Sequence, residues 1–303
     1  MINSKNTLHH LGIVTVAALA LGASLDVNAT VVGTKAVTPE PAISAKNDHV
    51  KQTASDEVSK RRAALDKKAI GARDNVLQAI LLLDQKNGKQ ALSLLNKADA
   101  GLKAVLARDP ALKLAPIDVR VSSYDIDSSP EVINKAIKDA KSALDNGKIQ
   151  TARAILAPMT SEMHIYTDML PMEIYPKAIK LAGKEIQDNK LSEAQATLAD
   201  AMSSVVTEEE IIPLPSLKAE GDVLEAEHLL KIDKVKNKDK VLSLLGDADR
   251  DLSNANLLGY GTYQNIRDEI ATTKSKVANN TSSPDLLERL KNQLHTLIHK
   301  ATS

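Results

Sequence analysis

Apolar residues recur at the spacing of an amphipathic helix along most of this chain, and this pattern limits the possible folds more than any other feature. The first run extends from Val58 to Leu83 behind Ser55, a suitable N-cap, and a second extends from Ala91 to Val105. Residues at this spacing share one face of a helix. Each run therefore predicts a helix with a narrow apolar face, of the kind that packs in bundles.

A helical hairpin pattern occurs three times, in residues 83–95, 144–156 and 186–198, and each copy places an alanine at the same offset from its opening Leu or Ile. Such a small residue allows two antiparallel helices to approach closely. Gly88 and Asn189 are predicted to end the first helix of their copies. The uneven spacing of the copies indicates αα-hairpins and not a regular solenoid, although any short helical hairpin favours a similar sequence.

Two segments depart from the helical pattern. Residues 116–126 and 163–170 resemble β-strands and are predicted to form a small antiparallel pair. The acidic run at residues 208–210 is interpreted as a solvated helix end. Aromatic residues make up only 2% of the chain, with no Phe or Trp, so Leu, Ala, Ile and Val must fill the core. The predicted fold is mainly α, with about ten helices arranged as antiparallel helical hairpins or a bundle and a small two-stranded β element.

The N-terminus has the pattern of a secretory signal peptide. Lys5 precedes an apolar stretch, and Val27-Asn28-Ala29 supplies small residues for cleavage before Thr30. An uncleaved anchor is the alternative, but the stretch is short for a membrane span. We expect residues 1–29 to be a signal peptide, 30–54 a flexible linker and 55–303 one folded domain. No later segment predicts an integral membrane anchor.

Composition excludes several classes of site. The chain has no cysteine, which excludes disulfides, a lipidated N-terminal cysteine and cysteine-ligated metals. It has 39 Lys+Arg and 39 Asp+Glu, and this balance gives no reason to expect nucleic acid as a partner. No serine, histidine and acid pattern indicates a catalytic site, and no cofactor is predicted.

The methionines are concentrated in one short region. This clustering has three interpretations: packing in the core, an adaptable binding or subunit surface, or a Cu(I) site. The tyrosines lie beside the methionines and beside a glycine loop, and tyrosine is favoured at interfaces. The candidate ligand or interface residues are Met159, Met163, His164, Tyr166, Met169, Met172, Tyr175, Tyr260 and Tyr263.

The histidines suggest two further roles. His295 and His299 are four residues apart and could chelate a metal, but Thr296 stands where a metalloprotease has glutamate, so a surface or packing role is favoured and no metal site is predicted. His164 and His228 could act as acid sensors, or could be ordinary half-buried histidines.

Three segments, Ser161–Thr167, Ile211–Pro215 and Leu257–Gly261, together resemble the YfdX protein family. The resemblance extends over the predicted folded region, from about Ser55 onward. It implies a mostly helical, oligomeric protein of the Gram-negative periplasm that is associated with acid and envelope stress. The family has no established enzymatic reaction.

The leading hypothesis is therefore a non-enzymatic periplasmic stress protein that forms a homo-oligomer and binds unfolded or small-molecule clients. A periplasmic small-molecule or copper-binding protein is the alternative, and a hydrolase with an unrecognised site is a third possibility. Because the two charge signs cancel near neutral pH, protonation of the carboxylates in acid should make the chain cationic and loosen subunit contacts.

Overall fold

The computed structural model describes residues 41–282 and 284–300. The predicted signal peptide and the first part of the predicted linker, up to residue 40, lie outside them. No described helix combines the length and the apolar character that a bilayer span requires. In chain order the elements are α1 (Pro41–Ala63), α2 (Lys67–Asp84), α3 (Gly88–Arg108), β1 (Leu114–Tyr124), α4 (Pro130–Asp145), α5 (Ile149–Leu156), β2 (Glu162–Pro171), α6 (Tyr175–Gln187), α7 (Leu191–Ser203), β3 (Val206–Pro213), α8 (Leu214–Ile232), α9 (Lys238–Leu257), α10 (Gln264–Ala278) and α11 (Pro284–Lys300).

The mainly α prediction is confirmed, and the β element is larger than expected. The three strands pair in the order β1-β2-β3, so a third strand joins the predicted two. The acidic residues 208–210 belong to β3, and their assignment to a helix end was wrong. The strand is fixed by partners distant in sequence: Thr207 donates a 2.7 Å hydrogen bond to Asp168 of β2, and Glu210 pairs with Arg61.

The described chain divides into two compact units, where the sequence predicted one. The larger unit contains residues up to Ser55, Val121–His164 and Ile211–Ser303, and the smaller unit contains Asp56–Arg120 and Ile165–Glu210. Each of the three strands passes from one unit into the other. The main apolar clusters of the two units are separate, which gives the physical reason for the division.

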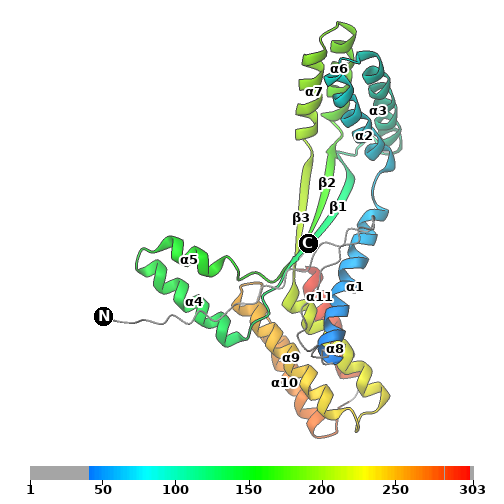
Figure 1. Cartoon of the computed structure of the whole chain (residues 1–303). Helices are drawn as coiled ribbons and strands as arrows, with labels where there is room; N and C mark the ends of the chain where they lie inside the picture. Colours follow the sequence, from blue (N-terminus) through cyan, green and yellow to red (C-terminus); the bar gives the residue numbers. More distant parts are fainter. Residues whose placement is uncertain (1–40, 283, 301–303) are drawn as a thin grey trace, which may run out of the picture. The chain divides into compact units, whose positions relative to one another are not determined.

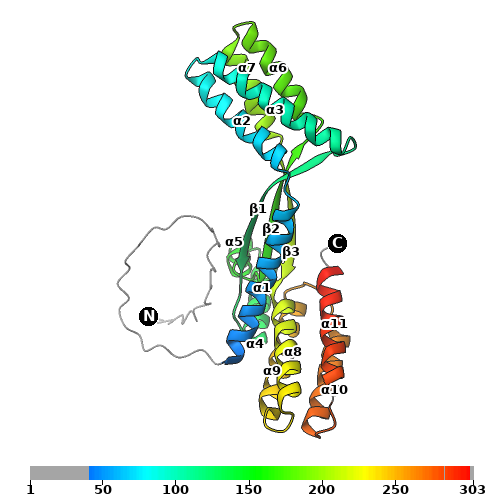
Figure 2. The same ribbon diagram turned by 90° about the vertical axis from the view of Figure 1, so that its right-hand side faces the viewer.

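The smaller unit is built from the hairpins α2–α3 and α6–α7, which form one four-helix group in Figures 1 and 2. Asp66 caps α2 by accepting hydrogen bonds from the N–H groups of Lys68 and Ala69, so the predicted run from Val58 to Leu83 is divided between α1 and α2. The predicted alanines Ala91 and Ala194 are fully buried between the helices.

The two turns of the smaller unit differ in how well they were predicted. Asn189 has the expected left-handed conformation, with φ of 60°. In the other hairpin this conformation belongs to Lys86, and Gly88 instead begins α3. A Cβ at Gly88 would lie 2.9 Å from a methyl carbon of Leu191, so a larger residue here would force that side chain of the second hairpin to shift.

The larger unit contains α8–α11, which share one apolar core, and the α4–α5 hairpin, which contacts α9 through α4. The first half of α1 also belongs to this unit. Residues 41–54 were predicted to be linker, but they are helical, and the side chains of Lys46 and His49 contact acidic residues of α9 and α8. These partners are far away in the sequence, which explains why the local composition indicated a linker.

Candidate functional site

The helix α8 is buried on several sides, and it carries three acidic residues whose exposed fractions are 5% or less: Glu220, Asp222 and Glu227. Burying a carboxylate is costly unless it is paired, hydrogen-bonded or protonated. Glu227 is paired with Lys231 on the same helix and with Lys291 of α11. The other two acids face residues of α1.

We use the name carboxylate cluster for Glu220 and Asp222 of α8 together with Asp251 of α9. The ammonium group of Lys46, in α1, donates a 3.2 Å hydrogen bond to Asp251 and lies 3.8 Å from Asp222. Neither carboxyl oxygen of Asp222 accepts a hydrogen bond from the part of the chain that the structure describes. One lysine from α1 therefore serves two buried acids.

Burial controls the protonation of this pair. It raises the pKa of Asp222 to about 8, against the attraction of Lys46, while the nearby charges of Asp251 and Asp247 act in the same direction as burial. Burial also raises the pKa of Asp251 despite Lys46, Lys218 and Arg250. The pKa of Lys46 is shifted upward, because the two acids outweigh its own burial. Asp222 is therefore protonated over much of the neutral range, and Lys46 stays charged.

Glu220 lies between two imidazoles. Its Oε2 is 3.2 Å from Nε2 of His49, in α1, and its Oε1 is 3.0 Å from Nδ1 of His295, in α11. Burial acts to raise the pKa of Glu220, but the hydrogen bonds and charges of the two histidines outweigh it and lower the pKa. Glu220 is thus the member of the cluster that stays ionised into mild acid.

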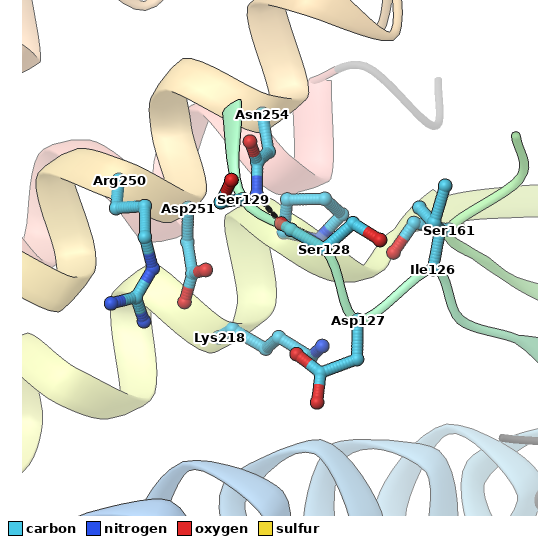
Figure 3. A pocket seen from close by; sticks show the side chains of 10 residues that line it. Ile126, Asp127, Ser128, Ser129, Ser161, Lys218, Arg250, Asp251 and Asn254 are labelled. Atoms are coloured by element: carbon cyan, nitrogen blue, oxygen red, sulfur yellow. Dashed lines mark hydrogen bonds between the residues drawn. The ribbon is translucent and has the colours of Figure 1, made fainter. Parts of the chain in front are cut away.

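A polar cavity of about 260 Å³ lies beside Asp251 (Figure 3). Asn254 donates a 3.0 Å hydrogen bond to the carbonyl of Ser128, and Lys218 donates a 2.5 Å hydrogen bond to Asp125. The cavity is slightly smaller than the ~300–1,000 Å³ typical of small-molecule sites. It suits water or a small polar molecule. Its lining residues are Ile126, Asp127, Ser128, Ser129, Ser161, Pro215, Lys218, Arg250, Asp251 and Asn254.

Five of the residues predicted from sequence lie in the larger unit: Met159, Met163, His164, Tyr260 and Tyr263. The ring of His164 forms an edge-to-face contact with Tyr124, with ring centroids 5.5 Å apart, and its Nε2 is 2.8 Å from Glu162.

His164 and Tyr124 line a second cavity, of about 360 Å³. The hydroxyl of Tyr260 accepts a hydrogen bond from the N–H of Ser161, and that of Tyr263 accepts one from Ser216. Met163 is fully buried and Met159 is half-buried.

The other four lie in the smaller unit: Tyr166, Met169, Met172 and Tyr175. Tyr175 is fully buried and donates a hydrogen bond to the sulfur of Met202, and burial raises its pKa. Met172 belongs to the apolar core. Tyr166 lies under the guanidinium of Arg120, at 5.5 Å, and Met169 is half-buried. The predicted residues therefore belong to several separate environments.

This distribution bears on the copper hypothesis. Met163 and Met169 are six residues apart on β2, and an extended strand separates such residues by about 20 Å. Their sulfurs do not meet at one ion. Within residues 41–282 and 284–300, no group of three or more His, Asp or Glu residues is placed to hold a metal. The side chain of His299 lies outside the described residues.

The α4–α5 hairpin exposes apolar side chains. Its interior contains the small residues Ala140, Ala143 and Ala152, with Ile155 half-buried against them. Ile149 and Leu156 are seven residues apart and share one face of α5, and their exposed fractions are 64% and 43%. Leu144, at the end of α4, is 50% exposed, and Val132, near the start of α4, is 44% exposed. These exposed aliphatic residues offer apolar area to a partner.

Sequence reasoning missed the carboxylate cluster and the two residues of α1 that contact it. A signal was present in α8, where acidic residues are interspersed among apolar and small residues without a separate polar face. A helix of this kind is buried on most sides, and its charges then require partners. The partners themselves are not visible locally, since Lys46 and Asp251 are 205 residues apart.

The fold defines a mainly α protein in which helical hairpins are interrupted by a three-stranded sheet. Residues 72–211, from α2 to β3, match the family model described as YfdX protein, which confirms the predicted resemblance over this stretch. The carboxylate cluster and Lys46 lie outside the matched residues. A crystal structure of YfdX from Salmonella Typhi is similar at 15% sequence identity, with a TM-score of 0.36, over 50% of this chain and 93% of that chain. No curated protein matches this chain.

Proposed function

We propose that this chain is an exported, non-enzymatic stress protein that binds exposed apolar segments of unfolding proteins and associates with itself. The observation that carries the proposal is the exposed apolar surface of the α4–α5 hairpin. Its helices bury mainly alanines against each other, so its larger aliphatic residues remain available to a client. Burying each such side chain is worth about 1.5–3 kcal/mol, which favours a client with exposed aliphatic groups.

The YfdX match supports this assignment only at the level of family, and the signal-peptide pattern supports export to the periplasm. Sequencing the N-terminus of the mature protein tests the second point. A protein that begins at Thr30 and is released from the periplasm agrees with it, whereas a cytoplasmic chain that retains Met1 contradicts it.

The client-binding proposal is tested by the light scattering of a thermally unfolding client protein. The wild type should suppress aggregation, and the variant Leu144→Ser/Ile149→Ser/Leu156→Ser should lose this effect. Substitutions at such exposed positions change stability by only about 0.5 kcal/mol.

A matched control replaces Leu81 and Leu181 by serine, since these are 63% and 51% exposed on helices of the smaller unit. This control should suppress aggregation as well as the wild type does. Suppression by the hairpin variant equal to that of the wild type, or no suppression by any of them, contradicts the proposal.

Self-association should respond to acid. The 39 basic and 39 acidic residues cancel near neutral pH, and below about pH 4 the carboxylates are protonated, so that the subunits repel one another. Sedimentation at pH 7 and below pH 4 should show a smaller assembly in acid, with more binding of an apolar dye. An unchanged mass together with unchanged dye binding contradicts this.

A further inference from the structure

Residues 46–55 of α1 are attached to the larger unit without any fully buried apolar side chain. None of the side chains described in this helix, residues 46–63, is buried. Helices usually gain most of their stability in a protein from an apolar face. The polar contacts of residues 46–55 and the closeness of their backbone to α8 therefore contribute most of the attachment.

The two helices approach each other closely at Gly221. A Cβ on this residue would lie 3.1 Å from Cα of Lys46 and 3.1 Å from Cβ of His49. Glycine in a helix costs about 1 kcal/mol relative to alanine. Here it allows the backbone of α1 to lie against α8, with Lys46 and His49 beside the crossing, where each meets an acid.

We infer that residues 46–55 form a strap that is docked on α8 at neutral pH and released in acid. Two pairs fasten it: Lys46 with Asp251, and His49 with Glu220. The side chain of Lys46 is only 11% exposed, so its charge depends on Asp251. This inference concerns a different face from the α4–α5 hairpin and does not depend on the client-binding proposal.

Charged groups of both signs surround the two pairs. Asp251 faces Lys46 and is also influenced by Lys218 of α8 and Arg250 of α9, and Arg250 is paired with Asp247 of α9. Glu220 faces His49 from α1 and His295 from α11. When Asp251 and Glu220 are protonated, the charges that remain at the two pairs are positive, both on the strap and on the helices that it contacts.

The order in which the two pairs break follows from the pKa shifts of their acids. Burial raises the pKa of Asp251, so the Lys46 pair loses its negative partner first as the pH falls. The pKa of Glu220 is lowered by the two histidines, so the His49 pair persists to lower pH. Below the ordinary carboxyl range of about pH 4, both pairs are lost and repulsion between the remaining cations releases the strap.

Spin-label distances can test the strap, because the chain has no cysteine and two introduced cysteines are the only labelling sites. Lys51→Cys in the strap and Gln293→Cys in α11 are both exposed in the larger unit. We expect one narrow distance distribution at pH 7, and its loss at about pH 3.5. A distribution that is equally narrow at both pH values would overturn the inference.

A second pair, Thr272→Cys in α10 with Gln293→Cys, reports on the body of the unit, since both residues are exposed there. It should stay narrow at both pH values. If it broadens together with the strap pair, acid unfolds the whole unit and the strap is not a separate device.

Variants at pH 7 test the cause. Glu220→Gln/Asp251→Asn imitates protonation and should release the strap at neutral pH, while Glu220→Gln alone should raise the pH of release. The matched control is Glu227→Gln, which changes another buried acid of α8 that is paired with Lys231 and Lys291 and not with α1. The control should keep the narrow distribution. A double variant as narrow as the wild type would overturn the inference.

Discussion

Two pairs of helices in this protein cross closely at a glycine but are held together by different chemistry. In the smaller unit, a Cβ at Gly101 of α3 would lie 3.2 Å from the carbonyl oxygen of Lys68 in α2. In the larger unit, a Cβ at Gly221 of α8 would lie 3.1 Å from Cα of Lys46 in α1. The backbones approach similarly, so the comparison isolates the side chains.

The α2–α3 contact is apolar. The helices bury Ala72, Val76, Leu102 and Val105, each with an exposed fraction of 1% or less. The contact of α1 with α8 and α9 is made instead by His49 and Lys46 on buried acids. Apolar burial does not depend on protons, whereas an ion pair exists only while both groups are charged. One chain can therefore contain two helix contacts of similar backbone geometry, of which one depends on pH and the other does not.

The largest expected effect concerns the apolar contact. Leu102→Ala removes a fully buried side chain and leaves a cavity, which should lower the free energy of unfolding by about 2–5 kcal/mol. Urea denaturation followed by circular dichroism measures this loss, and we expect the same loss at pH 7 and pH 5. A loss below about 1 kcal/mol, or one that changes with pH, would contradict the view that apolar burial holds α2 and α3 together.

The second effect concerns the charged side of the comparison. Because the pKa of Asp222 is about 8 when folded and near 4 when unfolded, the folded state binds more protons between these values, and its stability falls as the pH rises through them. Asp222→Asn should remove this dependence, which is on the order of a few kcal/mol. Denaturation from pH 5 to pH 9 measures it, and identical pH profiles for variant and wild type would contradict the assignment.

The third effect concerns a charged residue of the smaller unit that acts as a helix cap. Asp66 accepts hydrogen bonds from two N–H groups at the start of α2 and pairs with Arg108. Asp66→Ala should cost about 1–2 kcal/mol, and Asp66→Asn should recover most of the cap because it keeps an oxygen acceptor. Thermal unfolding distinguishes them. If both variants lose the same stability, the ion pair matters more than the cap.

The smallest effect is expected at an exposed pair. Arg120 lies over Tyr166 and pairs with Asp168, but its side chain is 56% exposed. Arg120→Gln should therefore change the free energy of unfolding by about 0–1 kcal/mol, and less at high salt. A larger loss, unaffected by salt, would show that an exposed charge here contributes as much as a buried one.

The sequence predicted the parts of the fold that depend on local pattern. The alanines at the same offset in each hairpin are all buried at a helix contact: Ala91, Ala152 and Ala194. They could be predicted because the spacing of apolar residues along a helix indicates which of its faces is buried. The strand β3 was missed, since its acidic residues favour no strand locally and its state depends on pairing with β2.

The candidate site could be predicted less well, for a related reason. The methionines and tyrosines were conspicuous by composition, but β2 carries them through different environments. Lys46, His49 and the acids of α8 and α9 look ordinary in sequence, and only the fold brings His49 to Glu220 across 171 residues. Burial gives these charges their importance, and burial is a property of the tertiary structure.

Native-state hydrogen exchange, corrected for intrinsic rates, tests the contrast between the two contacts most directly on the wild-type protein. Between pH 6.5 and about pH 3.5, residues 46–55 of α1 should lose their amide protection, while α2 and α3 should keep theirs. Loss of protection in α1 and α2 together, or in neither, would contradict the account.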